Sequence, residues 1–132
     1  MKAVPTVLRT AAALCAAALV AVPLAASPAS ASAAAGADLV ITVTAAKGGG
    51  AYRYLLTCDP DGGSHPRPGD ACRALQSVDG TVEELDVDPG PCLHVYAPVD
   101  VKVVGGWYGR RIAYHHEFPN RCLMSRTLGP VV

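Results

Sequence analysis

The 132-residue sequence lacks several features on which common functions depend. Its eleven Lys and Arg residues are balanced by eleven Asp and Glu residues, so it has no excess of positive charge for binding nucleic acid or an anionic membrane. It contains no G-x-S-x-G motif, and Ser64, Ser77 and Ser125 have no recognisable triad context. These absences argue against a nucleic-acid-binding or membrane-binding protein and against a serine hydrolase.

A hydrophobic run long enough to span a membrane is also missing. The first nine residues carry Lys2 and Arg9 and no acidic residue, residues 10–24 are mostly Ala, Val and Leu, and residues 29–33 contain two A-x-A sites. A membrane helix usually needs about 20 apolar residues, whereas this order is typical of a secretory signal peptide; the alternative is an N-terminal membrane anchor. We expect residues 1–33 to be removed on secretion, which leaves residues 34–132 as one small extracellular domain.

The cysteines of that domain lack the spacing of a zinc knuckle. Cys58, Cys72, Cys92 and Cys122 are separated by 14, 20 and 30 residues, and no C-x-x-C pair occurs. An even number of cysteines in an exported chain is typical of disulfide bonds, and two disulfides could join these four in three ways. A zinc site is the competing interpretation. We expect two disulfides, no bound metal and no cofactor.

The first half of the domain has the composition of two strands and a helix. Residues 38–44 and 51–58 are rich in β-branched and aromatic residues and predict strands joined by a glycine turn. Residues 59–69 are dominated by Pro, Gly, Asp and Ser, which favours a loop. Asp70 is placed to cap a short helix over residues 71–76.

The second half is more regular. Apolar residues at alternate positions of 99–103 predict a half-buried strand, Gly105-Gly106 a hairpin turn, and residues 107–116 the partner strand. Residues 123–132 could form a last edge strand. Four or five strands with a little helix predict a single α+β domain built on an antiparallel sheet.

Gly90–Pro98 is the strongest candidate for a functional segment. Pro89, Pro91 and Pro98 restrict its backbone and disfavour helix, and Cys92 can anchor it covalently. An extended, exposed and anchored segment is what a protease cleft accepts as a substrate. The alternative is an ordinary loop that leads into a strand.

Other candidate residues carry weaker signals. His115-His116-Glu117 is the most enzyme-like or metal-like cluster, but adjacent residues of a strand point to opposite faces, so we expect an ordinary strand end. His65 lies between Ser64 and Pro66 and is interpreted as a loop residue without a role. Trp107 is interpreted as core or hairpin packing.

Residues 34–132 resemble the Streptomyces subtilisin inhibitor family over most of their length. The matching segments are Leu55-Leu56-Thr57-Cys58 with Pro60, His65-Pro66, Asp70-Ala71-Cys72-Arg73-Ala74-Leu75, Cys92-Leu93-His94-Val95-Tyr96-Ala97-Pro98-Val99, Gly106-Trp107-Tyr108-Gly109-Arg110-Arg111 and Phe118-Pro119-Asn120-Arg121-Cys122. The resemblance implies a five-stranded antiparallel sheet with two short helices, disulfides Cys58–Cys72 and Cys92–Cys122, a homodimer formed through the sheet, and no enzymatic activity.

The resemblance also implies where a serine protease would bind. The family's reactive bond lies two residues after the third cysteine, which corresponds here to His94–Val95 within a binding loop that contains Pro91, Cys92, Leu93, His94, Val95 and Tyr96. Asn120 occupies the position from which the family supports the loop by hydrogen bonds. The family commonly has proline before the reactive residue and a large apolar or basic reactive residue, whereas this chain has Leu93 and His94.

Three functional hypotheses follow. The first is a secreted inhibitor of serine proteases, most naturally of the subtilisin type, that acts through His94–Val95. The second is a secreted, non-inhibitory binding module with the same fold and an altered loop. The third is a small secreted enzyme or metal protein that uses His115, His116 and Glu117.

Overall fold

The computed structural model describes residues 34–46 and 48–132, so the expected signal peptide lies outside the described residues. The elements follow one another as β1 (Ala37–Ala45), β2 (Ala51–Cys58), β3 (Gly62–Gly63), α1 (Pro68–Ser77), the 3-10 helix η1 (Val82–Glu84), β4 (Val99–Trp107), β5 (Arg110–Phe118), α2 (Arg121–Leu128) and the 3-10 helix η2 (Gly129–Val131). Across the described residues, no helix combines the length and the apolar character that crossing a membrane requires.

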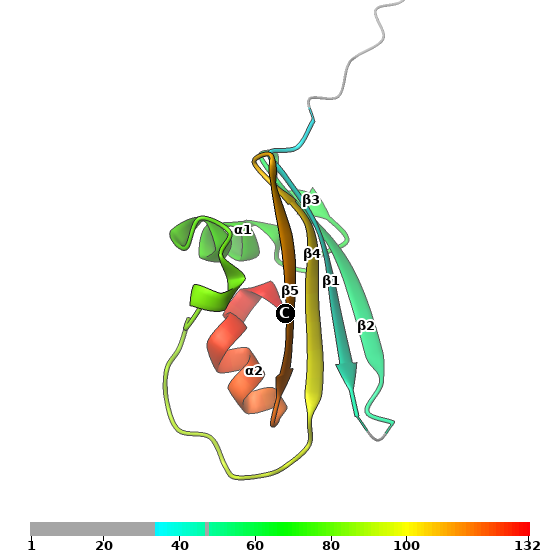
Figure 1. Ribbon diagram of the computed structural model, residues 1–132, viewed down its shortest axis with the longest axis vertical. Helices are drawn as coiled ribbons and strands as arrows, with labels where there is room; N and C mark the ends of the chain where they lie inside the picture. Colours follow the sequence, from blue (N-terminus) through cyan, green and yellow to red (C-terminus); the bar gives the residue numbers. More distant parts are fainter. Residues whose placement is uncertain (1–33, 47) are drawn as a thin grey trace, which may run out of the picture. The chain divides into compact units, whose positions relative to one another are not determined.

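Five antiparallel strands form one sheet in the order β3-β2-β1-β4-β5 (Figure 1). The central strand, β1, alternates between the two faces, with Leu39, Ile41 and Val43 fully buried on one of them. The fifth strand, β3, has only two residues and lies in the segment whose composition favours a loop. The expected α+β domain with a five-stranded antiparallel sheet and two helices is confirmed.

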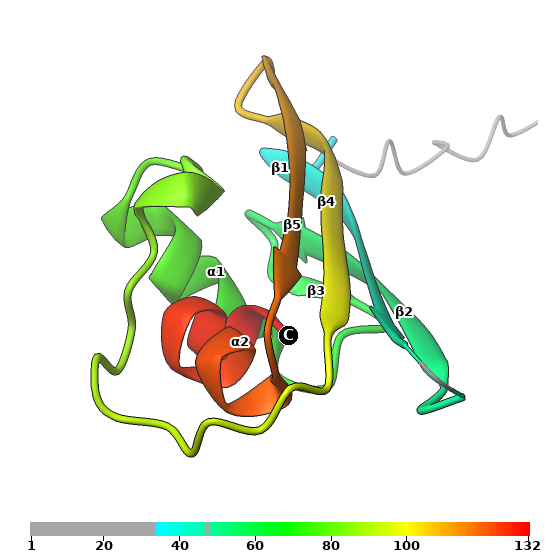
Figure 2. The ribbon, with the colours of Figure 1, turned by 60° about the horizontal axis from the view of Figure 1, so that its bottom comes forward.

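Both helices pack on the same face of the sheet (Figures 1 and 2). The core lies between them and the sheet, and its fully buried large side chains are Trp107, Leu39, Ile41, Leu56, Leu75, Leu128, Val43, Val82, Val99, Val101, Val103 and Val131. The opposite face carries Leu55 and Val104, which are 48% and 44% exposed. The sheet therefore has one covered and one open face, which is common for antiparallel sheets.

Helix α1 begins earlier than the sequence pattern indicates, and its start corrects the role expected for Asp70. The N-cap is Arg67, which makes no side-chain capping hydrogen bond, and Pro68 occupies the first helical position. Proline suits this position because its missing N–H would have no intrahelical partner there. Asp70 therefore lies inside the first turn, where its charge interacts favourably with the helix dipole instead of capping the helix.

The β4–β5 hairpin turns three residues later than predicted. Gly105 and Gly106 remain in β4, and Trp107 pairs with Arg110 across a two-residue turn. Tyr108 and Gly109 have φ values of 45° and 82°, and positive φ at both positions is typical of a type I′ turn. Gly105 serves a different purpose, because a Cβ atom there would lie 2.0 Å from the Asp38 carbonyl oxygen of the neighbouring strand.

The predicted edge strand over residues 123–132 is wrong. This segment is helical and forms most of α2 and then η2. Asn120 caps α2 by accepting a hydrogen bond from the Leu123 N–H, and Met124 and Leu128, four residues apart, are buried against the sheet. The segment thus covers the core as a helix and does not extend the sheet.

Two disulfides join the cysteines in sequence order, as the family resemblance implies. Cys58–Cys72 connects the end of β2 to α1, with Cα atoms 5.7 Å apart. Cys92–Cys122 connects the segment before β4 to the first turn of α2, with Cα atoms 6.0 Å apart. The second disulfide is the one that positions the candidate site.

Candidate functional site

The chain between η1 and β4 is a long loop that passes around α2 before it enters the sheet (Figures 1 and 2). Prolines at positions 89, 91 and 98 remove backbone donors and disfavour helix, which accounts for its irregular course. Leu93, Val95 and Tyr96 are 83%, 59% and 70% exposed, and His94 between them is exposed too. Apolar side chains that project together into solvent indicate a surface for binding another molecule.

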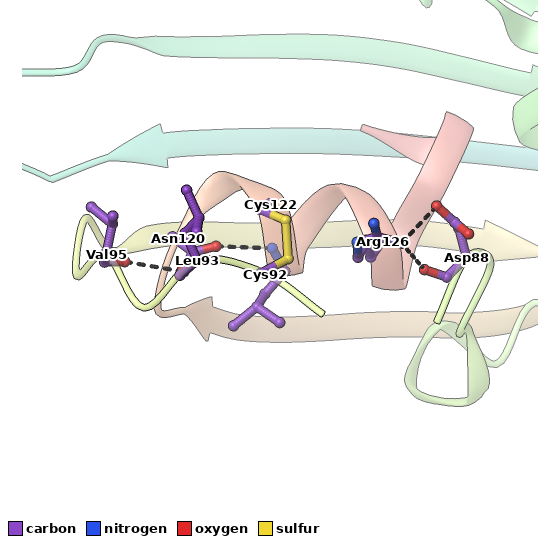
Figure 3. Close-up of a disulfide and its surroundings, with 8 residues drawn as sticks. Asp88, Cys92, Leu93, Val95, Asn120, Cys122 and Arg126 are labelled. Carbon is purple, nitrogen blue, oxygen red and sulfur yellow. Dashed lines mark hydrogen bonds and ion pairs between the residues drawn. A yellow bond between two sulfur atoms is a disulfide. The ribbon is translucent and has the colours of Figure 1, made fainter. Parts of the chain in front are cut away.

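A covalent bond fixes this loop immediately before its exposed residues. Cys92 is joined to Cys122, which lies in the first turn of α2 (Figure 3). The helix is itself packed on the sheet through Met124 and Leu128. The disulfide therefore ties the loop to a rigid part of the domain two residues before His94.

Asn120 holds the loop on both sides of His94. Its Nδ2 donates to the carbonyl oxygen of Val95 at 3.0 Å and to that of Leu93 at 3.4 Å (Figure 3). Its Oδ1 accepts from the Leu123 N–H at 3.0 Å, so the same side chain caps α2. Asn120 is only 8% exposed, and its donors and acceptor are all engaged. One buried amide thus connects the loop to the start of the helix.

Hydrogen bonds within the loop and after it complete this geometry. The Val95 N–H donates to the Leu93 carbonyl oxygen at 2.8 Å, which makes a tight turn around His94. Further along, the Ala97 N–H donates to the Pro119 carbonyl oxygen at 2.9 Å. The chain then enters β4 through Pro98, which is buried. Residues 95–98 are consequently fixed independently of Cys92.

Hollows flank the loop on two sides. One is bordered by Pro91, Pro119 and Leu123, and the other by Ala45 and Gly49 of the β1–β2 turn region, and Leu93, Val95 and Asn120 border both. The exposed residues therefore form a ridge supported from beneath by Asn120. A ridge of this kind fits into a cleft of a partner; it does not enclose a small molecule.

The other candidates do not form a comparable site. His115 interacts with Asp100, while His116 packs edge-to-face against Phe118 with ring centroids 4.5 Å apart, so the two histidines point to opposite faces as expected. Within residues 34–46 and 48–132, the one cluster of three potential metal ligands is Cys58, Asp61 and Cys72. Its two cysteines are joined in a disulfide and cannot act as thiolate ligands.

His65 has a structural role that the sequence interpretation missed. It is 5% exposed, accepts a hydrogen bond from the Arg67 N–H at Nδ1 (3.1 Å), and therefore donates from Nε2 to the Val131 carbonyl oxygen (3.2 Å). Burial lowers the pKa of His65 below its usual value, so the neutral ring is favoured. The one sequence signal for it was the His65-Pro66 pair within the family resemblance.

Trp107, which was interpreted as core or hairpin packing, is 2% exposed and precedes the β4–β5 turn. Its indole Nε1–H donates to Asp79 Oδ1 at 3.3 Å, so the polar part of the ring is satisfied at the edge of the core. That interpretation is confirmed.

Comparisons with known proteins point to one group. Residues 34–120 match a family described as subtilisin inhibitor-like. Subtilisin inhibitor-like protein 8 of Streptomyces virginiae is 46% identical over 77 residues, which cover 55% of this chain and 69% of that protein. Subtilisin inhibitor-like protein 5 of Streptomyces fradiae is 37% identical over 99 residues, which cover 69% and 92%.

A solved structure shows the same fold. It is the crystal structure of Streptomyces caespitosus sermetstatin in complex with Bacillus licheniformis subtilisin, which matches with a TM-score of 0.55 and 32% sequence identity. The match covers 72% of this chain and 96% of the other.

Proposed function

The chain belongs to the subtilisin inhibitor-like family, and on this premise we propose that it is an inhibitor of serine proteases, those of the subtilisin type above all, and not an enzyme. The observation that carries the proposal is the support of the exposed loop. Asn120 donates to the carbonyl groups on both sides of His94, and the Cys92–Cys122 disulfide anchors the chain beside it. The reactive bond is His94–Val95.

The loop binds as a substrate would. His94 occupies the pocket of the protease that selects the residue before the cut, and its carbonyl carbon faces the catalytic serine. Pro91, Cys92 and Leu93 precede it in the cleft, and Val95 and Tyr96 follow. Because the disulfide and Asn120 already hold this backbone in place, little conformational entropy is lost on binding. Contacts of this kind bury on the order of 1,600 Å² in total.

Inhibition arises because cleavage is easily reversed. When the serine attacks, the bond between the His94 carbonyl carbon and the Val95 nitrogen breaks, and the catalytic histidine of the protease protonates the Val95 amine. In an ordinary substrate this amine diffuses away. Here the Val95 carbonyl oxygen is held by Asn120 and the Ala97 N–H by Pro119, so the amine stays within reach and re-forms the bond.

The same proposal includes secretion. Residues 1–33 have the composition of a signal peptide, and the protein that remains contains two disulfides, which persist in oxidising compartments outside the cytoplasm. An extracellular serine protease is the corresponding partner.

A homodimer formed through the open face of the sheet is also part of the proposal. Strand pairing aligns Leu55, Val40, Val104 and Ala113 in one row across β2, β1, β4 and β5. Apolar side chains on an otherwise polar open face favour contact with a second copy, and a two-fold axis would place the same row on both sides.

Titration of the purified protein against a panel of serine proteases tests the inhibitory function. We expect stoichiometric inhibition of a subtilisin-type enzyme and, on long incubation, one slow cut at His94–Val95 that mass spectrometry identifies. Rapid cutting at several loop bonds without inhibition would contradict the proposal and would favour a non-inhibitory binding module.

A further inference from the structure

The half of the loop that precedes Cys92 lies along α2, where main-chain hydrogen bonds hold it. The Val87 N–H donates to the Thr127 carbonyl oxygen at 3.2 Å, and the Asp88 N–H donates to the Arg126 carbonyl oxygen at 2.9 Å. The chain therefore touches the last turns of the helix before it runs toward the disulfide in the first turn. Two ends of one helix support this half of the loop.

The Arg126 side chain adds a polar contact at the same place. Its Nη1 donates to the Asp88 carbonyl oxygen at 3.1 Å and forms an ion pair with Asp88 Oδ2 at 2.9 Å (Figure 3). Gly90 allows this approach, since a Cβ atom at that position would lie 2.6 Å from Nη1. The guanidinium thus engages both the backbone and the side chain of Asp88 while lying against Gly90. We call this contact the Arg126–Asp88 latch.

The latch is placed where it affects the loop more than the fold. The side chains of Arg126 and Asp88 are 32% and 74% exposed, and ion pairs this accessible to water add little to global stability. The loop, however, has leucine and not proline at position 93, so its backbone is not restricted by a ring immediately before His94. A second fixed point, four residues before Cys92, limits the motion of residues 89–91.

We propose that Arg126 is a positioning residue for protease binding, which holds residues 88–92 in the conformation that enters the cleft. This rests on the proposed inhibitory function. In the complex, the latch keeps the segment before His94 aligned, and after cleavage it helps the Cys92–Cys122 disulfide to retain the newly formed His94 carboxyl end beside the Val95 amine. Arg126 acts through Asp88 and Gly90 and requires no contact with the protease itself.

The test compares three variants of the full chain with the wild type. Arg126→Met removes the charge and the donors but retains a long side chain, and Arg126→Lys restores the charge with a single donor group. Arg73→Met is the control, because Arg73 forms an ion pair with Asp70 on α1 at 3.3 Å, away from the loop. Arg73 is the more exposed of the two arginines, with 77% of its side chain accessible against 32% for Arg126. The rate of cutting at His94–Val95 by a catalytic amount of subtilisin and the thermal unfolding midpoint are measured for each.

We expect Arg126→Met to be cut about tenfold faster than the wild type, because one more flexible stretch must be ordered on binding. The cutting rate of Arg126→Lys should lie between those of the wild type and Arg126→Met, and that of Arg73→Met should equal the wild-type rate. The thermal unfolding midpoint of every variant should stay within a few degrees of the wild-type value. If the wild type inhibits subtilisin and Arg126→Met is cut at the same rate as the wild type, the role of the latch is overturned but the inhibitory function is not. If Arg126→Met has a lowered unfolding midpoint and is cut at many bonds, Arg126 stabilises the fold, and the latch is overturned too. If the wild type does not inhibit subtilisin, both the latch and the proposed function are overturned.

Discussion

Replacing Asn120 separates its two roles, because its nitrogen supports the loop and its oxygen caps α2. Asn120→Asp keeps an oxygen for the Leu123 N–H, and its negative charge suits the helix N-terminus. It loses the donor that reaches Leu93 and Val95, and it places an oxygen opposite their carbonyl oxygens. Asn120→Ala loses both the loop support and the cap.

The size of the effect follows from the bonds that are lost. The bond from Asn120 to Val95 persists after cleavage, so the balance between intact and cleaved loop depends mainly on the bond to Leu93. One neutral hydrogen bond contributes about 0.5–1.5 kcal/mol, which corresponds to a change of roughly 2- to 13-fold in that balance. Both variants should therefore shift toward the cleaved form to that extent. The missing cap should make Asn120→Ala less stable than Asn120→Asp by about 1 kcal/mol.

Two assays separate these quantities. Chromatography with mass spectrometry follows intact and cleaved protein at equilibrium with a catalytic amount of subtilisin, and urea unfolding gives the free energy of unfolding. An Asn120→Asp variant whose intact fraction equals that of the wild type would refute the role assigned to the amide nitrogen. Equal unfolding free energies for the two variants would refute the cap.

Three further changes test other parts of the molecule. His94→Met should strengthen inhibition of subtilisin because an apolar side chain suits an apolar pocket; unchanged inhibition by the variant would contradict the reactive-bond assignment. Burial lowers the pKa of His65, so the unfolded chain takes up the proton more readily and the free energy of unfolding should fall as pH drops below the ordinary histidine value of 6.5. His65→Gln should flatten that decline, measured by urea unfolding at several pH values, and a slope equal to that of the wild type would count against it. Val104→Arg should convert the proposed dimer to a monomer in sedimentation velocity, because it places a charge in the centre of the apolar row; an unchanged dimer would exclude this face.

Local composition was sufficient for most of the sheet. β-branched and alternating residues predicted β1, β2 and β4 within a few residues, because burial of one face selects a period of two. The same reasoning placed the hairpin turn at Gly105-Gly106, which was wrong. Gly105 is needed because Asp38 of β1 approaches its backbone, and only the paired sheet reveals that approach.

The C-terminal segment shows a second limit. Residues 123–132 have mixed composition, and an edge strand was as consistent with it as a helix. Asn120 as N-cap and the spacing of Met124 and Leu128 were signals for α2 that the prediction did not use. The error mattered, because α2 carries Asn120, Cys122 and Arg126, which are the residues that hold the loop.

The sequence by itself determined that the chain contains a small disulfide-bonded α+β domain, and its motifs identified the loop and the candidate bond His94–Val95. Composition, periodicity and cysteine count report local preferences and burial, which is why they were enough for the domain, whereas the bond His94–Val95 is what the resemblance to the family implies. The resemblance to the family had pointed to Asn120, but only the tertiary structure shows which atoms hold the loop and adds Arg126, because these two side chains reach it across 25 to 38 residues of sequence. Such long-range polar contacts depend on where α2 packs, and no local pattern encodes that position.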